Sequence, residues 1–117
     1  MTILQPDALE HPVITVVRFP VPGPALSPAA ARELFERTAP RYRDVAGLRR
    51  KLFLSGEGSG GGLYEWGGRA DAERWFSPAW REQMRAAYGV EPTLEWFDAP
   101  CIVDNRSGTI SVQAVPS

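Results

Sequence analysis

The sequence contains one cysteine and one histidine, and this scarcity excludes several kinds of site. Cys101 alone cannot form an internal disulfide, and no cysteine cluster is available to hold zinc or iron. His11 lies in a polar N-terminal stretch without other ligands nearby, which argues against a zinc or 2-His-1-carboxylate site. A Ser-His-Asp triad lacks a suitable base, and no Rossmann fingerprint or Gly-x-Ser-x-Gly motif occurs. We therefore expect neither a metal nor a cofactor.

Long apolar runs and an excess of one charge are also missing. No apolar stretch approaches the roughly 20 residues that cross a bilayer. The first 12 residues do not have the pattern of a signal peptide. Thirteen basic and 14 acidic residues give a net charge of -1, so no strong field attracts nucleic acid or an anionic membrane. We expect a cytoplasmic protein that binds neither.

Apolar periodicity predicts strand, helix, strand, strand, helix and strand, in that order. Ser-Pro pairs at 27–28 and 77–78 have the pattern of a helix N-cap followed by proline at the first helical position. The expected strands are 13–19, 48–54, 63–67 and 93–97, the last continuing past Pro100 to 103. The expected helices begin at 28 and at 70, the second bending at 77–78 and ending near 88. Residues 109–115 alternate well enough for a short extra strand.

This order is that of a ferredoxin-like α+β fold, β-α-β-β-α-β, with an antiparallel sheet and helices on one face. We assign 13–105 to this domain, 1–12 to an N-terminal arm and 106–117 to a C-terminal arm. Two helices cover only one sheet face, yet the first and last strands and the middle of the second are apolar on both. The same face of a second copy is the simplest cover, so a homodimer is predicted.

A glycine-rich segment, residues 56–62, precedes the third strand. A phosphate-binding loop requires a helix directly after it, so that free N–H groups point at the anion. Because a strand follows here, we interpret the segment as a flexible hairpin loop.

Aromatic side chains are concentrated in the second half of the chain. We expect Trp75, Phe76 and Phe97 to fill the core. Tyr64 and Trp66 share one face of one strand, and for this pair core and ligand pocket both stay open. The remaining candidates for contact with a small aromatic ligand are Phe53, Trp80 and Tyr88. The last two could form a lid over the pocket, although a contact between helix and sheet is the simpler interpretation.

Polar candidates for chemistry are few. Arg50 alternates onto one face with Leu48, Leu52 and Leu54, where a guanidinium must reach outward or pair with an anion. It is a candidate for holding a substrate phenolate or an oxygen-derived anion. Asp98 is a candidate base, although aspartate in this position is more often a turn former. We interpret Cys101 as a small buried apolar residue.

Several segments resemble YdhR-type proteins of the dimeric α/β-barrel superfamily, which includes the antibiotic-biosynthesis monooxygenases. They are residues 47–51 (Gly-Leu-Arg-Arg-Lys), 62–66 (Gly-Leu-Tyr-Glu-Trp), 70–73, 88–92, 97–100 and 103–105. The resemblance implies two four-stranded sheets packed into a barrel across a dimer, with a pocket in each subunit between sheet and helices. Trp66 matches a strand tryptophan that lines this pocket in the related monooxygenases.

The resemblance also implies a monooxygenase that needs no flavin or metal and oxidises an acidic phenol or anthrone with O2. Tyr64, Trp66, Arg50 and Asp98 are then the candidate catalytic residues. The chain lacks a histidine base in the domain, so Asp98, Tyr64 or the acidity of the substrate must serve. A non-catalytic dimeric protein that binds a small ligand in the same pocket is the alternative, because one fold hosts many functions.

Overall fold

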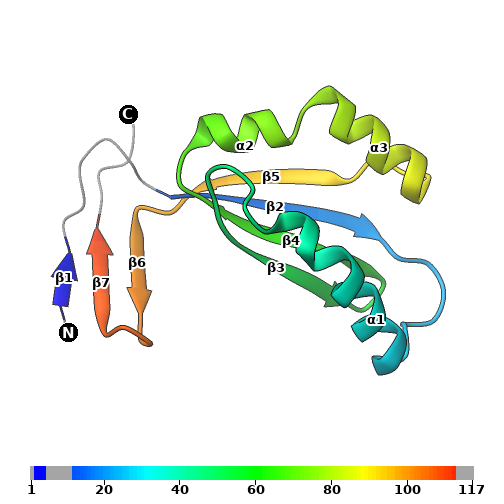
Figure 1. Cartoon of the computed structure of the whole chain (residues 1–117), viewed down its shortest axis with the longest axis horizontal. Coiled ribbons are helices and arrows are strands. Elements are labelled where there is room, and N and C mark those ends of the chain that lie inside the picture. The colour runs from blue at the N-terminus through cyan, green and yellow to red at the C-terminus, as the bar shows by residue number, and fades with distance from the viewer. Residues whose placement is uncertain (1, 5–11, 113–117) are drawn as a thin grey trace.

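The computed structural model describes residues 2–4 and 12–112 of the chain (Figure 1). The main body follows the predicted order: β2 (Val13–Pro20), α1 (Pro28–Thr38), the 3-10 turn η1 (Ala39–Tyr42), β3 (Leu48–Gly56), β4 (Ser59–Trp66), α2 (Arg69–Trp75), α3 (Pro78–Tyr88) and β5 (Thr93–Asp98). Three short strands lie outside this order: β1 (Thr2–Leu4), β6 (Cys101–Asp104) and β7 (Thr109–Val112). His11 and the predicted strand end at 113–115 lie outside the described residues.

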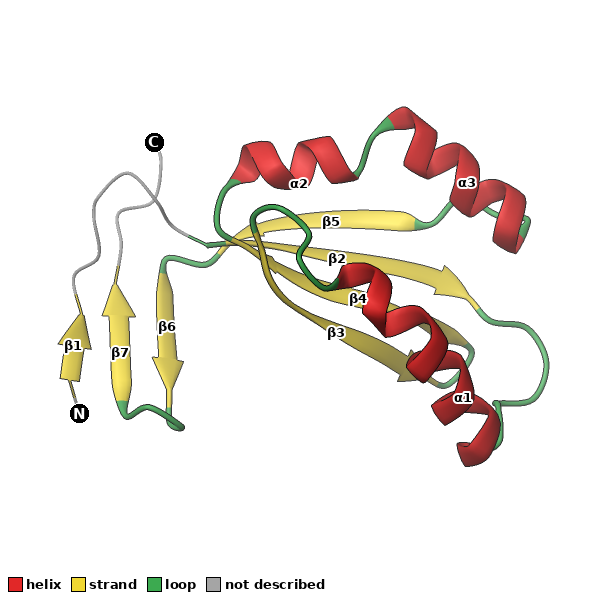
Figure 2. Cartoon of the chain, viewed as in Figure 1, coloured by secondary structure: helices red, strands yellow, loops and turns green. Residues whose placement is uncertain are grey.

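The four long strands form one antiparallel sheet in the order β3-β4-β2-β5. All three helices lie on the same face of this sheet, α1 beside β3 and β4, and α2 and α3 toward β5 (Figure 2). The predicted ferredoxin-like α+β fold is therefore confirmed. No helix in the described part of the chain is both long and apolar enough to span a bilayer.

Both predicted Ser-Pro helix starts are present. The Oγ atom of Ser27 accepts a hydrogen bond from the backbone N–H of Ala30, and Ser77 does the same for Trp80, each at 3.2 Å. Gly89 ends α3 in the left-handed conformation, with φ 74°. These caps hold α1 and α3 at fixed places over the sheet.

The core lies between the sheet and the helices. β2 contributes Val13, Thr15 and Val17, and β4 contributes Tyr64 and Trp66. The helical segment 72–80 closes the core with Ala72, Phe76 and Trp80. Thr15 is the one buried polar residue among the described residues, and its Oγ1 accepts a 3.0 Å hydrogen bond from Trp66 Nε1. This bond satisfies a donor and an acceptor that water cannot reach.

The glycine-rich segment forms a hairpin, as predicted, but most of it is strand and not flexible loop. Only Glu57 and Gly58 form the turn, and Gly60, Gly61 and Gly62 belong to β4. Gly61 has φ +153°, and a Cβ there would collide with the carbonyl oxygen of Val17. Glycine is needed at this position because β2 passes too close for a side chain.

The last predicted strand is split. β5 ends at Asp98 in the main sheet, and β6 begins at Cys101 in a separate sheet of order β1-β7-β6. This smaller sheet stands beyond one end of the main sheet (Figure 1). Pro100, which cannot donate a hydrogen bond to a neighbouring strand, lies in the break. Cys101 is exposed in β6, which corrects its interpretation as a buried residue.

A β-bulge alters the predicted faces of β3. The pairing with β4 shifts between Leu48 and Arg50, so Leu48 pairs with Trp66 and lies against the core. Leu48 therefore does not share a face with Arg50, as strict alternation predicted. Beyond the bulge the alternation is regular, with Lys51 opposite Tyr64 and Phe53 opposite Gly62.

The sheet face opposite the helices is apolar in its centre and uncovered by the described chain. We call it the open face, and its apolar side chains are Ile14, Val16, Leu52, Leu54, Leu63 and Phe97. Leu52 is 41% exposed and Phe97 is 51% exposed. Phe97 was expected in the core, and the register of β5 places it on the open face instead. Two ion pairs, Arg50–Glu65 and Arg18–Glu95, lie on the same face.

Candidate functional site

The only lysine in the sequence lies in a cage of aromatic rings on the helix side of β3. Lys51 Nζ is 3.3 Å from the ring centroid of Tyr42, 4.1 Å from that of Phe53 and 4.6 Å from that of Tyr64. The rings come from η1, β3 and β4, so three elements meet at this amine. We call these four residues the Lys51 site.

The backbone of β4 leaves room for the lysine stem. A Cβ on Gly62 would lie 2.8 Å from Lys51 Cε and 3.3 Å from Tyr64 Cε1. Gly62 is buried beside Tyr64, and its missing side chain creates the space that the stem occupies. The glycine-rich sequence therefore shapes the site by letting a long side chain cross the strand.

Burial shifts the titration of the polar groups in the site. It lowers the pKa of Lys51 to about 7, because the half-buried ammonium loses water. It raises the pKa of Tyr64 far above the ordinary value, and the neighbouring phenol of Tyr42 adds to this rise. The pKa of Tyr42 is raised as well, again chiefly by burial. At neutral pH both phenols are therefore uncharged hydrogen-bond donors beside an amine that can gain or lose a proton.

A groove of about 360 Å³ opens beside the site along the edge strand β3. Its walls are Ala39 and Tyr42 of η1, Arg43 and Asp44 after it, and Leu48 with residues 49–51 and Phe53 of β3. Volumes of this order fit a small ligand. Tyr42, Lys51 and Phe53 line both the cage and the groove, so a bound aromatic ring would meet the amine directly.

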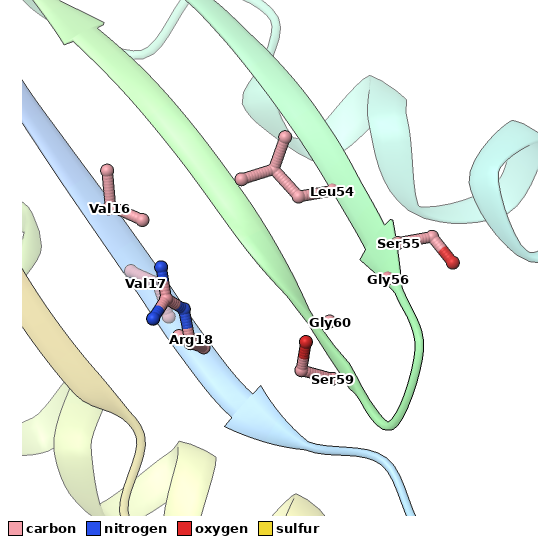
Figure 3. A pocket seen from close by; sticks show the side chains of 8 residues that line it. All are labelled: Val16, Val17, Arg18, Leu54, Ser55, Gly56, Ser59 and Gly60. Atoms are coloured by element: carbon pink, nitrogen blue, oxygen red, sulfur yellow. The ribbon is translucent and has the colours of Figure 1, made fainter.

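A second hollow, of about 280 Å³, lies beside Ser59 and Gly60 at the start of β4 (Figure 3). It lies over Gly60 between Val16 and Arg18 of β2 and Leu54 of β3. Arg18 is its only ionisable group. The hollow therefore offers shape without acid–base chemistry, and the Lys51 site is the stronger candidate.

Tyr64 and Trp66, the central pair of the sequence prediction, are buried in the core. Their rings are stacked at 5.8 Å with planes 3° apart, and Phe76 packs edge-on against both. Trp66 has no exposed surface and is held by Thr15. Tyr64 joins the Lys51 site through its ring face, whereas Trp66 lies behind it as a support.

The aromatic packing leaves one polar atom unsatisfied. Trp75 lies against Tyr42 with ring centroids 5.6 Å apart. Its Nε1 is buried and has no hydrogen-bond partner in the part of the chain that the structure describes. The Trp75 N–H lowers the pKa of Tyr64 and so opposes the larger effect of burial. It therefore lies near the Tyr64 hydroxyl, without being aligned for a hydrogen bond to it. An unsatisfied donor beside the site is an unusual arrangement in a protein interior.

Arg50 is separated from the aromatic pair by the sheet itself. Its Nε lies 3.3 Å from Glu65 Oε2 on the open face, the side opposite Tyr64. Sequence alternation indicated that Arg50 needs an anion, and Glu65 of the neighbouring strand is that anion. Arg50 also reaches the rim of the groove, where its side chain is about half exposed.

The other predicted residues are distributed around the fold. Phe53 lies in the Lys51 site. Asp98 is exposed at the end of β5, the strand farthest from β3 in the sheet. Trp80 packs on Phe76 in the core at 4.8 Å. Tyr88, at the end of α3, is 53% exposed and stacks on Phe19 at 4.4 Å. Trp80 and Tyr88 are absent from the walls of the groove.

Sequence reasoning missed Lys51 and Tyr42 as site residues. A signal for Lys51 was present, because it is the single lysine beside twelve arginines, on the face that alternation gives to Phe53. Tyr42 lies in η1, the 3-10 turn that follows the first helix, and carries no sequence motif of its own. Among the described residues, no three metal-ligating side chains gather elsewhere to suggest a different centre.

Comparison with known proteins gives structural but not sequence matches. No family model and no curated protein matches the chain. The structure of a variant of SnoaB, a cofactor-independent oxygenase from Streptomyces nogalater, matches with a TM-score of 0.53. It is 23% identical, and the match covers 76% of this chain and 93% of SnoaB. A protein of unknown function from Nitrosomonas europaea matches with a TM-score of 0.54 at 16% identity, over 80% of this chain and 92% of that one.

The chain has the fold of these two proteins. SnoaB is a cofactor-independent oxygenase, and the likeness to it agrees with the fold that the sequence resemblance implied. Identity below a quarter carries no activity from one protein to the other.

Proposed function

We propose that the chain is a cofactor-independent oxygenase that oxidises a small acidic aromatic compound, such as a hydroquinone, naphthol or anthrone, with O2 at the Lys51 site. The observation that carries this proposal is the half-buried amine of Lys51, enclosed by three aromatic rings beside a groove. The structural likeness to a cofactor-independent oxygenase supports it.

The residues of the site match the requirements of this chemistry. The substrate loses a proton, its anion gives one electron to O2, and the radical pair combines to a hydroperoxide that loses water to leave a carbonyl group. The rings of Tyr42 and Phe53 provide surfaces for an aromatic plane. The ammonium form of Lys51 and the neutral phenols of Tyr42 and Tyr64 would stabilise an oxyanion.

The proposal keeps only part of the site predicted from sequence. Tyr64 and Phe53 belong to the site, and Arg50 lies at the rim of the groove. Trp66 supports Tyr64 from behind. Asp98, Trp80 and Tyr88 are left without a role in the reaction, because they lie toward the other edge of the sheet.

We also propose that two copies pair through the open face. Its apolar side chains include the exposed Leu52, Leu54 and Phe97 on the two edge strands, and the helices cover only the opposite face. Burial of apolar surface of this kind is worth about 25 cal/mol per Å², so a second copy of the same face is a favourable cover. The Lys51 site lies on the helix side and remains accessible in such a pair.

Oxygen uptake by purified protein, treated to remove metals, tests the proposed activity. Hydroquinones, naphthols and anthrones form the panel, and we expect uptake above the uncatalysed rate with a quinone or related ketone as the product. Replacement Phe53→Leu removes one ring of the cage and should lower the rate about tenfold or more. The matched control is Tyr88→Leu, an aromatic outside the groove, which should retain the rate.

Two outcomes contradict parts of the proposal. If Tyr88→Leu lost activity and Phe53→Leu kept it, the substrate would bind near α3 and not at the Lys51 site. A raised melting temperature with these compounds, but no oxygen uptake, would show a ligand-binding protein without turnover.

A further inference from the structure

The basic side chains of this protein are almost all of one kind. Twelve are arginines and one is a lysine, Lys51. Arginine stays protonated at any pH that a protein tolerates, whereas a buried lysine can lose its proton near neutrality. The one position with a removable charge is also the position enclosed by three rings. We propose that Lys51 is the base that takes the proton from the bound substrate, an inference that rests on the proposed function.

A substrate in the groove can reach the amine of Lys51, and few other groups compete with the substrate for that amine. Lys51 lines the groove, so an acidic hydroxyl bound there meets its nitrogen. No carboxylate in the described part of the chain lies within salt-bridge distance of Nζ. A paired carboxylate would hold the amine in its charged form. Without one, the amine keeps a free lone pair over much of the neutral range.

The groups that face Lys51 are mostly uncharged. Tyr42 of η1 and Tyr64 of β4 have pKa values raised by burial, and Phe53 has no charge. Charged groups occur only at the rim of the groove: Arg43, Asp44, Arg49 and Arg50, all exposed. Burial lowers the pKa of Lys51 to about 7 in this setting, so the neutral amine is well populated under ordinary conditions.

The proton transfer is balanced within the site. The lone pair of the Lys51 amine takes the proton of the phenol O–H, or of the acidic C–H of an anthrone, and leaves a substrate anion beside an ammonium. The three ring faces then attract the ammonium and offset part of the cost of charging a half-buried amine. After O2 combines with the anion, the ammonium returns its proton to the peroxide anion, and the neutral amine is restored.

The other bases considered from sequence fit less well. Asp98 is on β5, three strands from β3 in the sheet, a separation of roughly 14 Å at about 4.8 Å per strand. Tyr64 remains a neutral phenol because its pKa is raised. The domain therefore does not need a histidine for this step, and the absence noted in the sequence is explained.

A titration without any substrate gives the first test. Because the chain has one lysine, lysine labelled with carbon-13 gives a single side-chain Cε resonance. We expect this resonance to titrate near pH 7. A midpoint at the ordinary value for lysine would overturn the proposal, whatever compounds the protein oxidises.

Binding of 1-naphthol at a pH of about 8 gives the second test, because free naphthol is then neutral and Lys51 is largely neutral. We expect bound naphthol to absorb as naphtholate, with no proton released to the medium. The variant K51R keeps a charge but cannot accept a proton, so each naphtholate formed should release one proton. The variant K51M should bind neutral naphthol. A neutral spectrum in the unmodified protein would overturn the proposal.

Oxygen uptake separates this inference from the proposed function. We expect K51M and K51R to lose about 10²-fold or more in rate, and both to recover with a substrate that is already ionised in solution. Uptake that is unchanged in both variants would overturn the role of Lys51 and leave the oxygenase standing. Proton transfer to Lys51 without uptake by any compound would reject the oxygenase and leave the base standing. Thermal unfolding of each variant verifies that the fold is intact.

Discussion

At the scale of single residues, the titration of Lys51 should make the stability of the domain depend on pH. Its pKa is about 7 in the folded chain, below the ordinary value expected in the unfolded chain. Between these two values the unfolded chain binds more protons, so the free energy of unfolding rises with pH in this window. Below about pH 7 the full penalty of burying an ammonium is present.

The variant K51M removes this penalty while keeping an unbranched side chain inside the cage. It should be more stable than the unmodified protein at acidic pH, and the difference should shrink as the pH rises from about 7 toward 10. Urea denaturation at a series of pH values measures both curves. A difference that does not change across the series would mean that Lys51 titrates normally.

The hydrogen bond between Trp66 and Thr15 is the other decisive contact at this scale. In Thr15→Val the indole N–H stays buried without an acceptor, which should lower the free energy of unfolding by about 1 to 3 kcal/mol. Thr15→Ser keeps the hydroxyl, so its free energy of unfolding should fall by less than that of Thr15→Val. Denaturant unfolding compares the two, and equal losses would assign the effect to packing of the methyl group.

At the scale of the elements, β4 is unusual because a run of glycines forms part of a central strand. Gly61→Ala should destabilise the fold strongly, since a Cβ there meets the backbone of β2. Gly58→Ala is the matched control: its φ is +72°, but no atom lies within 4 Å of the added carbon. We expect a loss of about 1 to 2 kcal/mol for Gly58→Ala and clearly more for Gly61→Ala. Similar melting temperatures for the two variants would contradict the steric argument.

The elements also show what the sequence could and could not predict. Helix starts at Ser27 and Ser77 depend on local chemistry, and both were predicted correctly. The glycines of β4 carry no strand propensity of their own, because their conformation is imposed by the neighbouring strand. The departure of β6 from the main sheet depends on its pairing with β7, which local alternation does not specify.

The candidate site was predictable only in part for a similar reason. Tyr64 and Phe53 were found because they are aromatic residues on predicted strands. Lys51 gains its environment from a bulge in β3, a tight turn at η1 and a missing side chain at Gly62. Each of these is a tertiary feature, and no one of them is visible in the spacing of residues around position 51.

At the scale of the whole molecule, the proposed pairing of two copies depends on the open face. Leu52→Glu places a charge on that face at the edge strand β3, and we expect it to weaken pairing of two copies by about 10²-fold or more. Leu26→Glu alters a leucine in the loop before α1 that is even more exposed, at 56%, and should leave pairing unchanged. Sedimentation equilibrium measures both variants. A monomeric unmodified protein, or equal association of the two variants, would contradict the proposed interface.

The smaller sheet has a consequence for the order in which the chain folds. β1 pairs in parallel with β7, Thr2 opposite Thr109, so strands from the two ends of the chain are neighbours. During synthesis on a ribosome β1 emerges first but has no partner until nearly the whole chain has followed. Closing so long a loop has a high entropic cost, whereas β3 and β4 join through a two-residue turn. The four-stranded sheet can therefore form first, and the smaller sheet is completed only when β7 is available to pair with β1.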